Sequence, residues 1–546
     1  MTPVLSDLEE TASSVFGWDH LRSGQRQAMQ ALLEGRNVLC VMPTGSGKSA
    51  IYQVPGLVIP GVVVVISPLI ALQHDQAEAL NASAGAGRAY VVNSGLSRSD
   101  TDEAWEAAGE PDEDRRAKFL FLAPEQVAKE EAAERLRNLD VSLLVIDEAH
   151  CVSAWGHDFR PDYLQLGTLT DSLSCPVLAL TATASAPVQE EITGQLHLGD
   201  PVVLVEGFDR PNLFLEVVPH VQEADKHRAV VEQVEGLEKP GLVYVATRKA
   251  ADTLAEELSA LGMKAASYHS GRRASDREEV HEGFLAGRLD VVVATTAFGM
   301  GIDKPDVRFV VHEAVADSLD SYYQEIGRGG RDGGPAAATL HYRTEDLSLR
   351  RFFAAKTADR DGLEQLFAVL RAQERPTDLK ELRALTGLSQ RKAAGLMNLL
   401  EAAGAVRAGP DGYSAENFPP PEAAERAVEQ ARIRETIDTS RVEMSRRYAE
   451  TRGCRRQFLL AYFGEEFDGS CGHCDNCADA SSVDCEQQPE AEVPYAVQSK
   501  VEHAEWGPGT VMSYEEGTVT VLFETTGYRT LSLDLVAEKG LLRAAG

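Results

Sequence analysis

The fold is decided by a short stretch near the start of the chain, VLCVMPTGSGKS (38–49). Its apolar run, Val38–Met42, ends in a loop with glycines at positions 45 and 47, and the loop opens a helix. A strand that leads through a glycine-rich turn into a helix is the arrangement whose backbone N–H groups cradle phosphates. Lys48 can reach the β- and γ-phosphates, and Ser49 can hold Mg²⁺. The full pattern has glycine where this chain has Met42, so an ordinary glycine-rich turn stays open on this stretch alone.

A second stretch, LLVIDEAH (143–150), argues against that alternative. It is an apolar strand that ends in two carboxylates, Asp147 and Glu148. Asp147 is expected to hold Mg²⁺ through water, and Glu148 to orient or deprotonate an attacking water. The carboxylates could instead cap the following helix, but their position at a strand end, downstream of a phosphate loop, favours catalysis.

The segment QEIGRGGRDG (324–333) supplies Arg328 and Arg331, three residues apart and therefore on one helical face. Negative charge spreads in the transition state of phosphoryl transfer, so a cationic side chain is expected there. Both arginines are predicted to be catalytic. Since they come late in the chain, the nucleotide is predicted to bind between two lobes that close on ATP and open on hydrolysis.

Short apolar runs alternate with helical stretches from about residue 36 to 313. Near-continuous Val, Ile and Leu runs indicate strands that are buried on both faces of a parallel sheet. The predicted strands are Asn37–Met42, Val62–Ser67, Lys118–Ala123, Leu143–Ile146, Pro176–Leu180, Gly241–Ala246, Lys264–Tyr268, Val291–Ala294 and Phe309–His312. A break near residues 208–212 predicts two doubly wound α/β lobes.

Composition excludes several classes of protein. The 546 residues carry 53 Lys and Arg against 85 Asp and Glu, a net charge of −32. Such acidity usually argues against a polyanionic partner, but a binding groove is local whereas net charge is an average. No apolar run approaches the roughly 18 residues of a membrane span, and the acidic N-terminus lacks the features of a signal peptide. We therefore expect a cytoplasmic protein.

The pattern changes after residue 355. Two helical stretches, Gly362–Arg371 and Leu379–Leu385, precede a third that Ser389 can cap, and a turn between short strands follows in GAVRAGPDGYS (404–414). This order predicts a winged helix. A polar helix follows over residues 423–449. Residues 478–493 are acidic and rich in Ser, Glu and Gln, which predicts a flexible linker. The last 50 residues alternate apolar and polar side chains between glycine turns, which predicts a small five-stranded β-barrel.

Four of the eight cysteines crowd into CRRQFLLAYFGEEFDGSCGHCDNC (454–477). Their spacing suits a closed tetrahedral Zn²⁺ site of four thiolates, with Cys454, Cys471, Cys474 and Cys477 as ligands. An iron–sulfur cluster is the rival, but its usual run continues with a cysteine three residues on and a proline, which this chain lacks. His473 lies between ligands and is expected to face solvent.

In this order, the motifs resemble those of RecQ-type DNA helicases, continuously over about residues 14 to 350. The resemblance implies two tandem RecA-like lobes, and it extends to the zinc module. It also implies nucleotide contacts from FGWDHLRSGQ (16–25), with Trp18 stacked on adenine. The implied ATP-binding residues are Trp18, Arg22, Gln25, Thr44, Gly45, Ser46, Gly47, Lys48, Ser49 and Asp303.

Other matching segments imply DNA contact and its coupling to hydrolysis. They are the aromatic-rich loop CVSAWGHDFRPDY (151–163), LTATAS (180–185) and YHSGR (268–272). The implied residues are Trp155, His157, Phe159, Arg160, Thr181, Thr183 and His269. The alternative for the loop is a buried aromatic cluster, and single hydroxyls elsewhere could be turn formers.

The chain departs from the family pattern in several places. His74 stands where Lys is usual, and Ala154 replaces a commonly polar residue. The winged helix precedes the zinc module instead of following it, so the family's strand-splitting hairpin cannot be carried over. The last 50 residues instead resemble the Tudor-like tail of UvrD-type helicases. That resemblance implies docking on DNA, single-strand binding protein or RNA polymerase, although the glycines there could be plain hairpin turns.

The sequence thus predicts six segments. They are RecA-like lobe 1 (1–206), RecA-like lobe 2 (207–355), a winged-helix-like domain (356–422), a helical zinc module (423–480), an acidic linker (481–496) and a small barrel (497–546). The resemblance implies an ATP- and Mg²⁺-dependent helicase that moves 3′ to 5′ on single-stranded DNA and unwinds duplexes in repair or recombination. Two alternatives stay open, namely an RNA remodeller and a binding platform with a vestigial motor.

Overall fold

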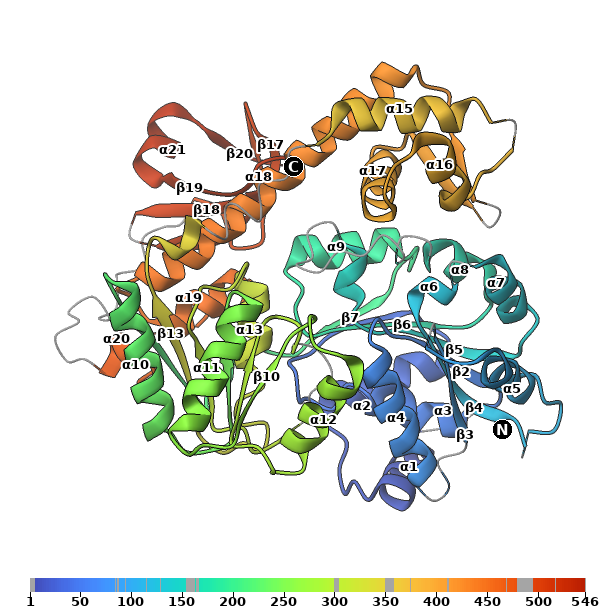
Figure 1. Cartoon of the computed structure of the whole chain (residues 1–546), viewed down its shortest axis with the longest axis horizontal. Coiled ribbons are helices and arrows are strands. Elements are labelled where there is room, and N and C mark those ends of the chain that lie inside the picture. Colours follow the sequence, from blue (N-terminus) through green and yellow to red (C-terminus); the bar gives the residue numbers. More distant parts are fainter. Residues whose placement is uncertain are drawn as a thin grey trace.

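Two parallel α/β sheets form most of the molecule, and a helical arm and a small antiparallel sheet lie beside them (Figure 1). The structure is a computed structural model. It describes residues 5–83, 85, 88–93, 95–113, 115–127, 129–153, 163, 166–298, 304–348, 358–373, 375–409, 412–467, 469–478, 494–515 and 517–545. No helix in these ranges is both long enough and apolar enough to cross a bilayer.

Lobe 1 is built on a seven-stranded sheet in the order β3-β4-β2-β5-β6-β1-β7. Its strands are β1 (Val38–Val41), β2 (Val62–Ile66), β3 (Arg88–Val92), β4 (Ala117–Leu122), β5 (Val141–Ile146), β6 (Val177–Thr181) and β7 (Val202–Val205). Successive residues of β1 enter different cores, since Val38 packs with Ala28 of α2 and Leu39 joins the core on the other face. Helices therefore cover both faces, which explains the unbroken apolar runs.

The helices of lobe 1 are α1 (Leu5–Phe16), α2 (Ser23–Leu33), α3 (Ala50–Val58), α4 (Ile70–Ala82), α5 (Arg98–Ala108), α6 (Pro124–Val127), α7 (Glu130–Arg137), α8 (Leu166–Ser172) and α9 (Ala186–Gln195), with a 3₁₀ helix, η1, at Ala149–Val152. All strand pairs of this sheet are parallel, so the loops that carry the motifs meet at one edge. That edge faces lobe 2.

Lobe 2 has a six-stranded parallel sheet in the order β10-β11-β9-β12-β13-β8. Its strands are β8 (Leu213–Pro219), β9 (Gly241–Tyr244), β10 (Ala265–Tyr268), β11 (Val291–Ala294), β12 (Phe309–His312) and β13 (Ala336–Tyr342). Its helices are α10 (Glu223–Gly236), α11 (Arg248–Ala260), α12 (Ala274–Leu285) and α13 (Leu319–Ile326). The two doubly wound lobes that the sequence predicts are confirmed.

The sequence prediction omits four strands, β3, β7, β8 and β13. Strands β7 and β8 lie at sheet edges, where alternate residues stay partly exposed, so no continuous apolar run marks them. Strand β13 reads AAATLHY, and alanine is a weak strand former. Edge strands and strands of small residues therefore lack the long buried apolar runs from which the other strands are predicted.

Three helices and a two-stranded hairpin follow lobe 2. They are α15 (Arg360–Arg371), α16 (Leu379–Thr386), α17 (Gln390–Ala402), β14 (Val406–Gly409) and β15 (Gly412–Ala415). We call them the three-helix unit. Ser389 caps α17 by accepting a hydrogen bond from the Lys392 N–H, as the sequence predicts. The unit has its own core, which Leu366, Phe367 and Met397 form against alanines of the next helix.

That next helix, α18 (Pro420–Glu450), has 31 residues and connects the three-helix unit to the cysteine cluster. In Figure 1 the unit lies at one end of α18 above lobe 1, and the other end of α18 lies against lobe 2. Two short helices follow, α19 (Arg455–Tyr462) and α20 (Asp475–Ala478). We call α18, α19 and α20 with the cysteines the zinc module.

The chain ends in a five-stranded antiparallel sheet in the order β19-β18-β17-β16-β20, here called the C-terminal sheet. Its elements are β16 (Lys500–His503), β17 (Gly507–Glu515), β18 (Thr518–Phe523), β19 (Gly527–Ser532), α21 (Leu533–Lys539) and β20 (Leu542–Ala544). Arg447 of α18 bonds to Thr520, Thr530 and Glu515 of this sheet. Lys500 pairs with Glu190 of α9, 2.6 Å away, so the sheet also touches lobe 1.

Candidate nucleotide site and metal centre

The glycine-rich loop has the backbone that the sequence predicts. Gly45 and Gly47 adopt φ values of +80° and +81°, a region that side chains disfavour. A Cβ atom on Gly47 would lie 2.7 Å from the side-chain nitrogen of Gln25. The Lys48 ammonium donates to the Met42 carbonyl, 3.0 Å away, so the residue at the unusual first position of the loop serves through its backbone.

The N-terminal motif is attached directly to this loop. Gln25 accepts a hydrogen bond from the Arg22 N–H and donates to the carbonyls of Ser46 and Gly47 at 3.3 and 3.0 Å. The Trp18 ring stacks on Phe16 with 4.5 Å between centroids. Three residues predicted to contact the nucleotide, together with the loop, therefore lie on adjoining elements.

The two carboxylates follow β5, as predicted. Asp147 accepts a hydrogen bond from the Glu148 N–H, and the Ser67 hydroxyl lies 3.5 Å from its other carboxylate oxygen. Glu148 itself has a φ of +50°, an uncommon conformation for a residue with a side chain. Ser67 directly follows β2, the neighbouring strand, and is a site residue that the sequence prediction did not single out.

Burial controls the charges in this cluster. Burial and the charge of Glu148 together raise the pKa of Asp147 to about 7, although the charge of Lys48 opposes them. Burial lowers the pKa of Lys48, although Glu148 and Asp147 favour its charged form. The cluster thus has two carboxylates near one partly buried ammonium. A divalent cation at Asp147 and Ser49 would stabilise both carboxylates, so these residues fit Mg²⁺.

A chain of polar contacts connects this cluster to lobe 2. The His150 ring lies 3.2 Å from the Glu148 carboxylate and 3.0 Å from the Thr181 hydroxyl. Thr181 donates to the Thr183 carbonyl, 3.1 Å away. The Thr183 hydroxyl then accepts from the amide of Gln324, which comes from α13 of the other lobe, at 3.3 Å. The sequence prediction named both threonines but not Gln324 as their partner.

The two predicted arginines have different surroundings. Arg331 reaches lobe 1, since a Cβ atom on Gly45 would lie 3.3 Å from its Cγ. Arg328 is only 5% exposed and contacts the Tyr244 hydroxyl inside lobe 2. Burial raises the pKa of Tyr244 to about 12, and Arg328 opposes this rise. The structure brings Arg331 to the phosphate loop and leaves Arg328 within its own lobe.

Four cysteines gather where the spacing predicts a metal. The sulfur atoms of Cys454, Cys471, Cys474 and Cys477 all lie within 4.8 Å of one another, and no disulfide joins them. Cys471 and Cys477 are 3.8 Å apart. A zinc ion with Zn–S bonds of about 2.3 Å requires sulfur atoms about 3.8 Å apart at the corners of a tetrahedron. The donor set and its size fit Zn²⁺, and the closed set of four leaves no position for substrate.

Comparison with known proteins gives three family matches. The DEAD/DEAH box helicase family matches residues 22–192, and the helicase conserved C-terminal domain matches residues 225–333. The RecQ zinc-binding family matches residues 422–478. A probable ATP-dependent DNA helicase, RecS of Bacillus subtilis, is 34% identical over 87% of this chain and 92% of its own length. The chain belongs to the RecQ family of ATP-dependent DNA helicases.

Other RecQ-family members extend beyond the region of similarity. The ATP-dependent DNA helicase RecQ of Bacillus subtilis is 35% identical over 86% of this chain but only 66% of its own length. Among solved structures, the helicase Lhr of Mycobacterium smegmatis, bound to single-stranded DNA and AMP-PNP, matches 80% of this chain and 62% of its own. Its TM-score is 0.52 at 20% identity, which shows the fold alone.

The RecQ-type zinc module packs on the edge of lobe 2. Asp475, between two cysteines, bonds to Arg455 at 2.5 Å and accepts the Val217 N–H of β8 at 2.9 Å. The exposed His473, as expected, directs no ring atom to the cluster, but its carbonyl accepts the Leu215 N–H at 3.2 Å. The module therefore covers an edge strand that would otherwise expose unpaired backbone groups.

Most of the residues that the resemblance implies for DNA contact lie outside the described part of the chain. Trp155, His157, Phe159, Arg160 and Asp303 lie outside the described residues. The His269 ring is 6% exposed and lies 3.1 Å from the carboxylate of Asp252, whose side chain is 41% exposed. Its contact with DNA stays a prediction.

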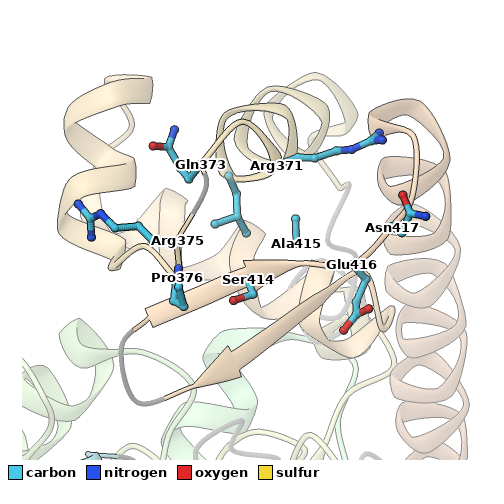
Figure 2. A pocket seen from close by; sticks show the side chains of 9 residues that line it. Arg371, Gln373, Arg375, Pro376, Ser414, Ala415, Glu416 and Asn417 are labelled. Carbon is cyan, nitrogen blue, oxygen red and sulfur yellow. The ribbon is translucent and has the colours of Figure 1, made fainter.

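A cavity of about 280 Å³ lies in the three-helix unit, away from the interlobe site (Figure 2). Arg371 and Arg375 are among its lining residues, and Arg371 extends along one side. Both are already engaged, because Arg371 donates to the Phe418 carbonyl and Arg375 pairs with Glu381 at 2.9 Å. The cavity has no part in the nucleotide site.

Proposed function

We propose that this RecQ-family helicase hydrolyses ATP between its two lobes and uses the cycle to move 3′ to 5′ on single-stranded DNA, unwinding duplexes in repair or recombination. The observation that carries the proposal is the meeting of Arg331 with the phosphate loop across the cleft. An arginine that reaches the phosphate loop from the second lobe is placed to neutralise charge in the transition state of phosphoryl transfer.

Each side chain at the cleft has a distinct proposed task. Lys48 and the loop N–H groups bind the phosphates, while Ser49 and Asp147 hold Mg²⁺, which would neutralise charge on the phosphates. Glu148 orients the attacking water, and Arg331 neutralises negative charge in the transition state. The remaining proposed ATP contacts, besides the loop, are Trp18, Arg22, Gln25 and Asp303.

The polar contacts across the cleft support a coupling role. Gln324 of lobe 2 bonds to Thr183, and Thr181 bonds to the His150 that follows the catalytic carboxylates. Loss of the γ-phosphate removes the negative charge that attracts Arg331 of lobe 2 towards the phosphate loop of lobe 1. We infer that the two threonines then pass this change to the strand-binding loops of lobe 1, including Trp155 and Arg160.

Two assignments in the C-terminal half are also proposals. We infer that the three-helix unit is a winged helix, since a turn of three residues, Gly387–Ser389, joins α16 to α17 and a hairpin follows. We infer that the C-terminal sheet is a small barrel that offers a docking surface to single-strand binding protein or RNA polymerase. Its sequence of tight antiparallel turns supports the barrel.

Strand displacement with ATP and Mg²⁺ on 3′-tailed, 5′-tailed and blunt DNA duplexes tests the function. We expect unwinding of the 3′-tailed duplex alone. Lys48→Ala should abolish it, because the β- and γ-phosphates lose their cation, with rates falling by about a hundredfold or more. The matched control is Lys539→Ala, which removes an exposed lysine from α21.

Four outcomes contradict the proposal in whole or in part. Unwinding that survives in Lys48→Ala would place hydrolysis elsewhere, and unwinding from a 5′ tail would reverse the polarity. Activity on RNA duplexes alone would favour the RNA remodeller. DNA-stimulated ATP hydrolysis without unwinding would retain the motor but remove strand separation from the proposed function.

A further inference from the structure

The helix that carries the cleft contacts of lobe 2, α13, is held from outside by the zinc module. Asp320, in its first turn, accepts a hydrogen bond from the Tyr462 hydroxyl of α19 at 2.6 Å. Tyr322, in its middle, lies 5.2 Å from Tyr448 of α18, measured between ring centroids. Two positions of a short helix are therefore fixed by residues that follow it by more than 100 positions.

The contact at Asp320 is a buried polar cluster. Asp320 is 8% exposed, Tyr462 is 2% exposed and Arg441 of α18 is 6% exposed. Burial raises the pKa of Tyr462, and the carboxylate of Asp320 raises it further, so the hydroxyl stays protonated and donates. A buried carboxylate is costly unless hydrogen bonds and an opposite charge compensate it. Tyr462 and Arg441 supply both, which restricts Asp320 to one position.

The C-terminal sheet reaches the same cluster. The Tyr528 ring of β19 stacks on Tyr462, with centroids 5.2 Å apart and planes at 28°. The Tyr528 N–H donates to the Ser440 hydroxyl of α18 at 3.0 Å. Gly527 has a φ of +69°, and a Cβ atom there would collide with Ser440. The start of β19 is thus fixed to α18 by its backbone.

The other end of α13 reaches the nucleotide site. Gln324 bonds to Thr183 of lobe 1, and Arg331 follows in the turn beyond the helix. Asp320 and Gln324 are one helical turn apart, about 6 Å along the axis. A short helix moves as a rigid unit over this distance, so a shift at Asp320 also displaces Gln324 and the start of the glycine-rich turn that leads to Arg331.

We propose that Asp320 and Tyr462 are positioning residues for ATP hydrolysis, and that the C-terminal sheet supports them through Tyr528. The inference rests on the proposed function of the cleft, in which Arg331 acts on the nucleotide. The last 50 residues then contribute to the rate of hydrolysis, besides any partner that they bind.

The test compares DNA-stimulated ATP hydrolysis in Tyr462→Phe, Tyr528→Ala and the wild type. Tyr462→Phe removes only the hydroxyl, and we expect kcat to fall about threefold to tenfold because Arg331 loses its alignment. Tyr528→Ala should give a similar loss, and the double variant no more than the larger single loss. The KM for ATP and the affinity for single-stranded DNA should stay unchanged, because neither site touches these residues.

Tyr495→Phe is the matched control. Its hydroxyl donates to the Leu542 carbonyl at 2.7 Å within the C-terminal sheet, away from α13. A wild-type kcat in folded Tyr462→Phe would overturn the proposal, and so would a loss of kcat matched by the same fraction of unfolded protein. Should Tyr462→Phe fail to fold, Asp320→Asn, which keeps the size of the side chain, is measured for the same kcat loss. Absence of hydrolysis in the wild type and in Tyr495→Phe alike would instead remove the proposed function.

Discussion

Two arginines three residues apart in the sequence have different neighbours in the folded chain. Arg331 approaches Gly45 of the phosphate loop, whereas Arg328 lies beside Tyr244 within lobe 2. The sequence predicts that both lie on one helical face, and this prediction is wrong, because helix α13 ends before either arginine. The difference arises after the helix ends at Ile326, where the glycine-rich turn redirects the chain.

The surroundings of the two arginines predict different effects of their removal, on catalysis for Arg331 and on stability for Arg328. Arg331→Ala should lower kcat for ATP hydrolysis by about a thousandfold, the usual contribution of such an arginine, with little change in melting temperature. Arg328→Ala removes a buried cation and should destabilise the fold by about 3 kcal/mol. Steady-state kinetics and thermal unfolding of both variants check this. A normal kcat in Arg331→Ala, or a normal melting temperature in Arg328→Ala, would contradict the assignment.

At the residue scale, the sequence predicts the catalytic residues of lobe 1 better than it predicts which residues contact them. Lys48, Asp147 and Glu148 follow strands that a buried apolar run identifies, so their position at one sheet edge follows from topology. The contacts of Ser67 and Gln324 become visible only in the folded structure. Ser67 becomes a neighbour of Asp147 only because β2 and β5 pair, and Gln324 meets Thr183 only when the lobes meet.

At the scale of elements, a histidine between two carboxylates connects three parts of lobe 2. His227 of α10 lies 3.0 Å from Glu313, which follows β12, and 2.7 Å from Glu257 of α11. Burial alone would lower the pKa of His227, but hydrogen bonds with Glu313 and Glu257 and their charges raise it. Three elements of the lobe are therefore connected most strongly when this imidazole carries a proton.

This raised pKa gives lobe 2 a stability that depends on pH. The charged form stabilises the fold fully below the unfolded pKa of about 6.5, and its contribution is lost as pH rises through the raised folded pKa. We expect His227→Gln to lower the melting temperature at pH 6, with the deficit shrinking towards pH 9. The control is His20→Gln, at an exposed position. A deficit that stays constant across this range would contradict the role of the charge.

The edge strands that sequence patterns missed share a physical cause. The pattern predicts β1, β2 and β5 well because both of their faces are covered, whereas β7 exposes Val203 and Val205 at the sheet edge. Alternate residues of the edge strand β8 stay partly exposed, so no apolar run marks it. The zinc module covers its edge through a contact between residues more than 200 positions apart. Such coverage depends on the assembled molecule and leaves no local pattern.

At the scale of the whole molecule, the zinc module is the common contact of the other parts. Its Arg456 donates to the Leu213 carbonyl of lobe 2 at 2.9 Å, and Arg447 bonds to the C-terminal sheet. Alanines 423, 424 and 427 of the same module complete the core of the three-helix unit. Lobe 2, the C-terminal sheet and the three-helix unit therefore all pack against the zinc module.

Loss of the metal should accordingly affect more than the cysteine cluster. Cys474→Ser replaces a fully buried thiolate and should release the bound zinc, about one equivalent per chain, and lower the melting temperature. Cys175→Ser is the control, because it removes a cysteine far from the cluster in sequence and outside the four-cysteine set. Metal content and thermal unfolding are the measurements. Full zinc content in Cys474→Ser would rule out the four-cysteine site.

Helix α18 also acts as a lever arm. Its last turns are fixed to lobe 2, where Tyr448 lies 5.2 Å from Tyr322, and its first turns enter the core of the three-helix unit. A helix of 31 residues is about 46 Å long. If it follows lobe 2 as a rigid rod, a rotation of lobe 2 by about 10° sweeps its far end through about 8 Å. Small openings of the cleft thus become large excursions of the three-helix unit above lobe 1.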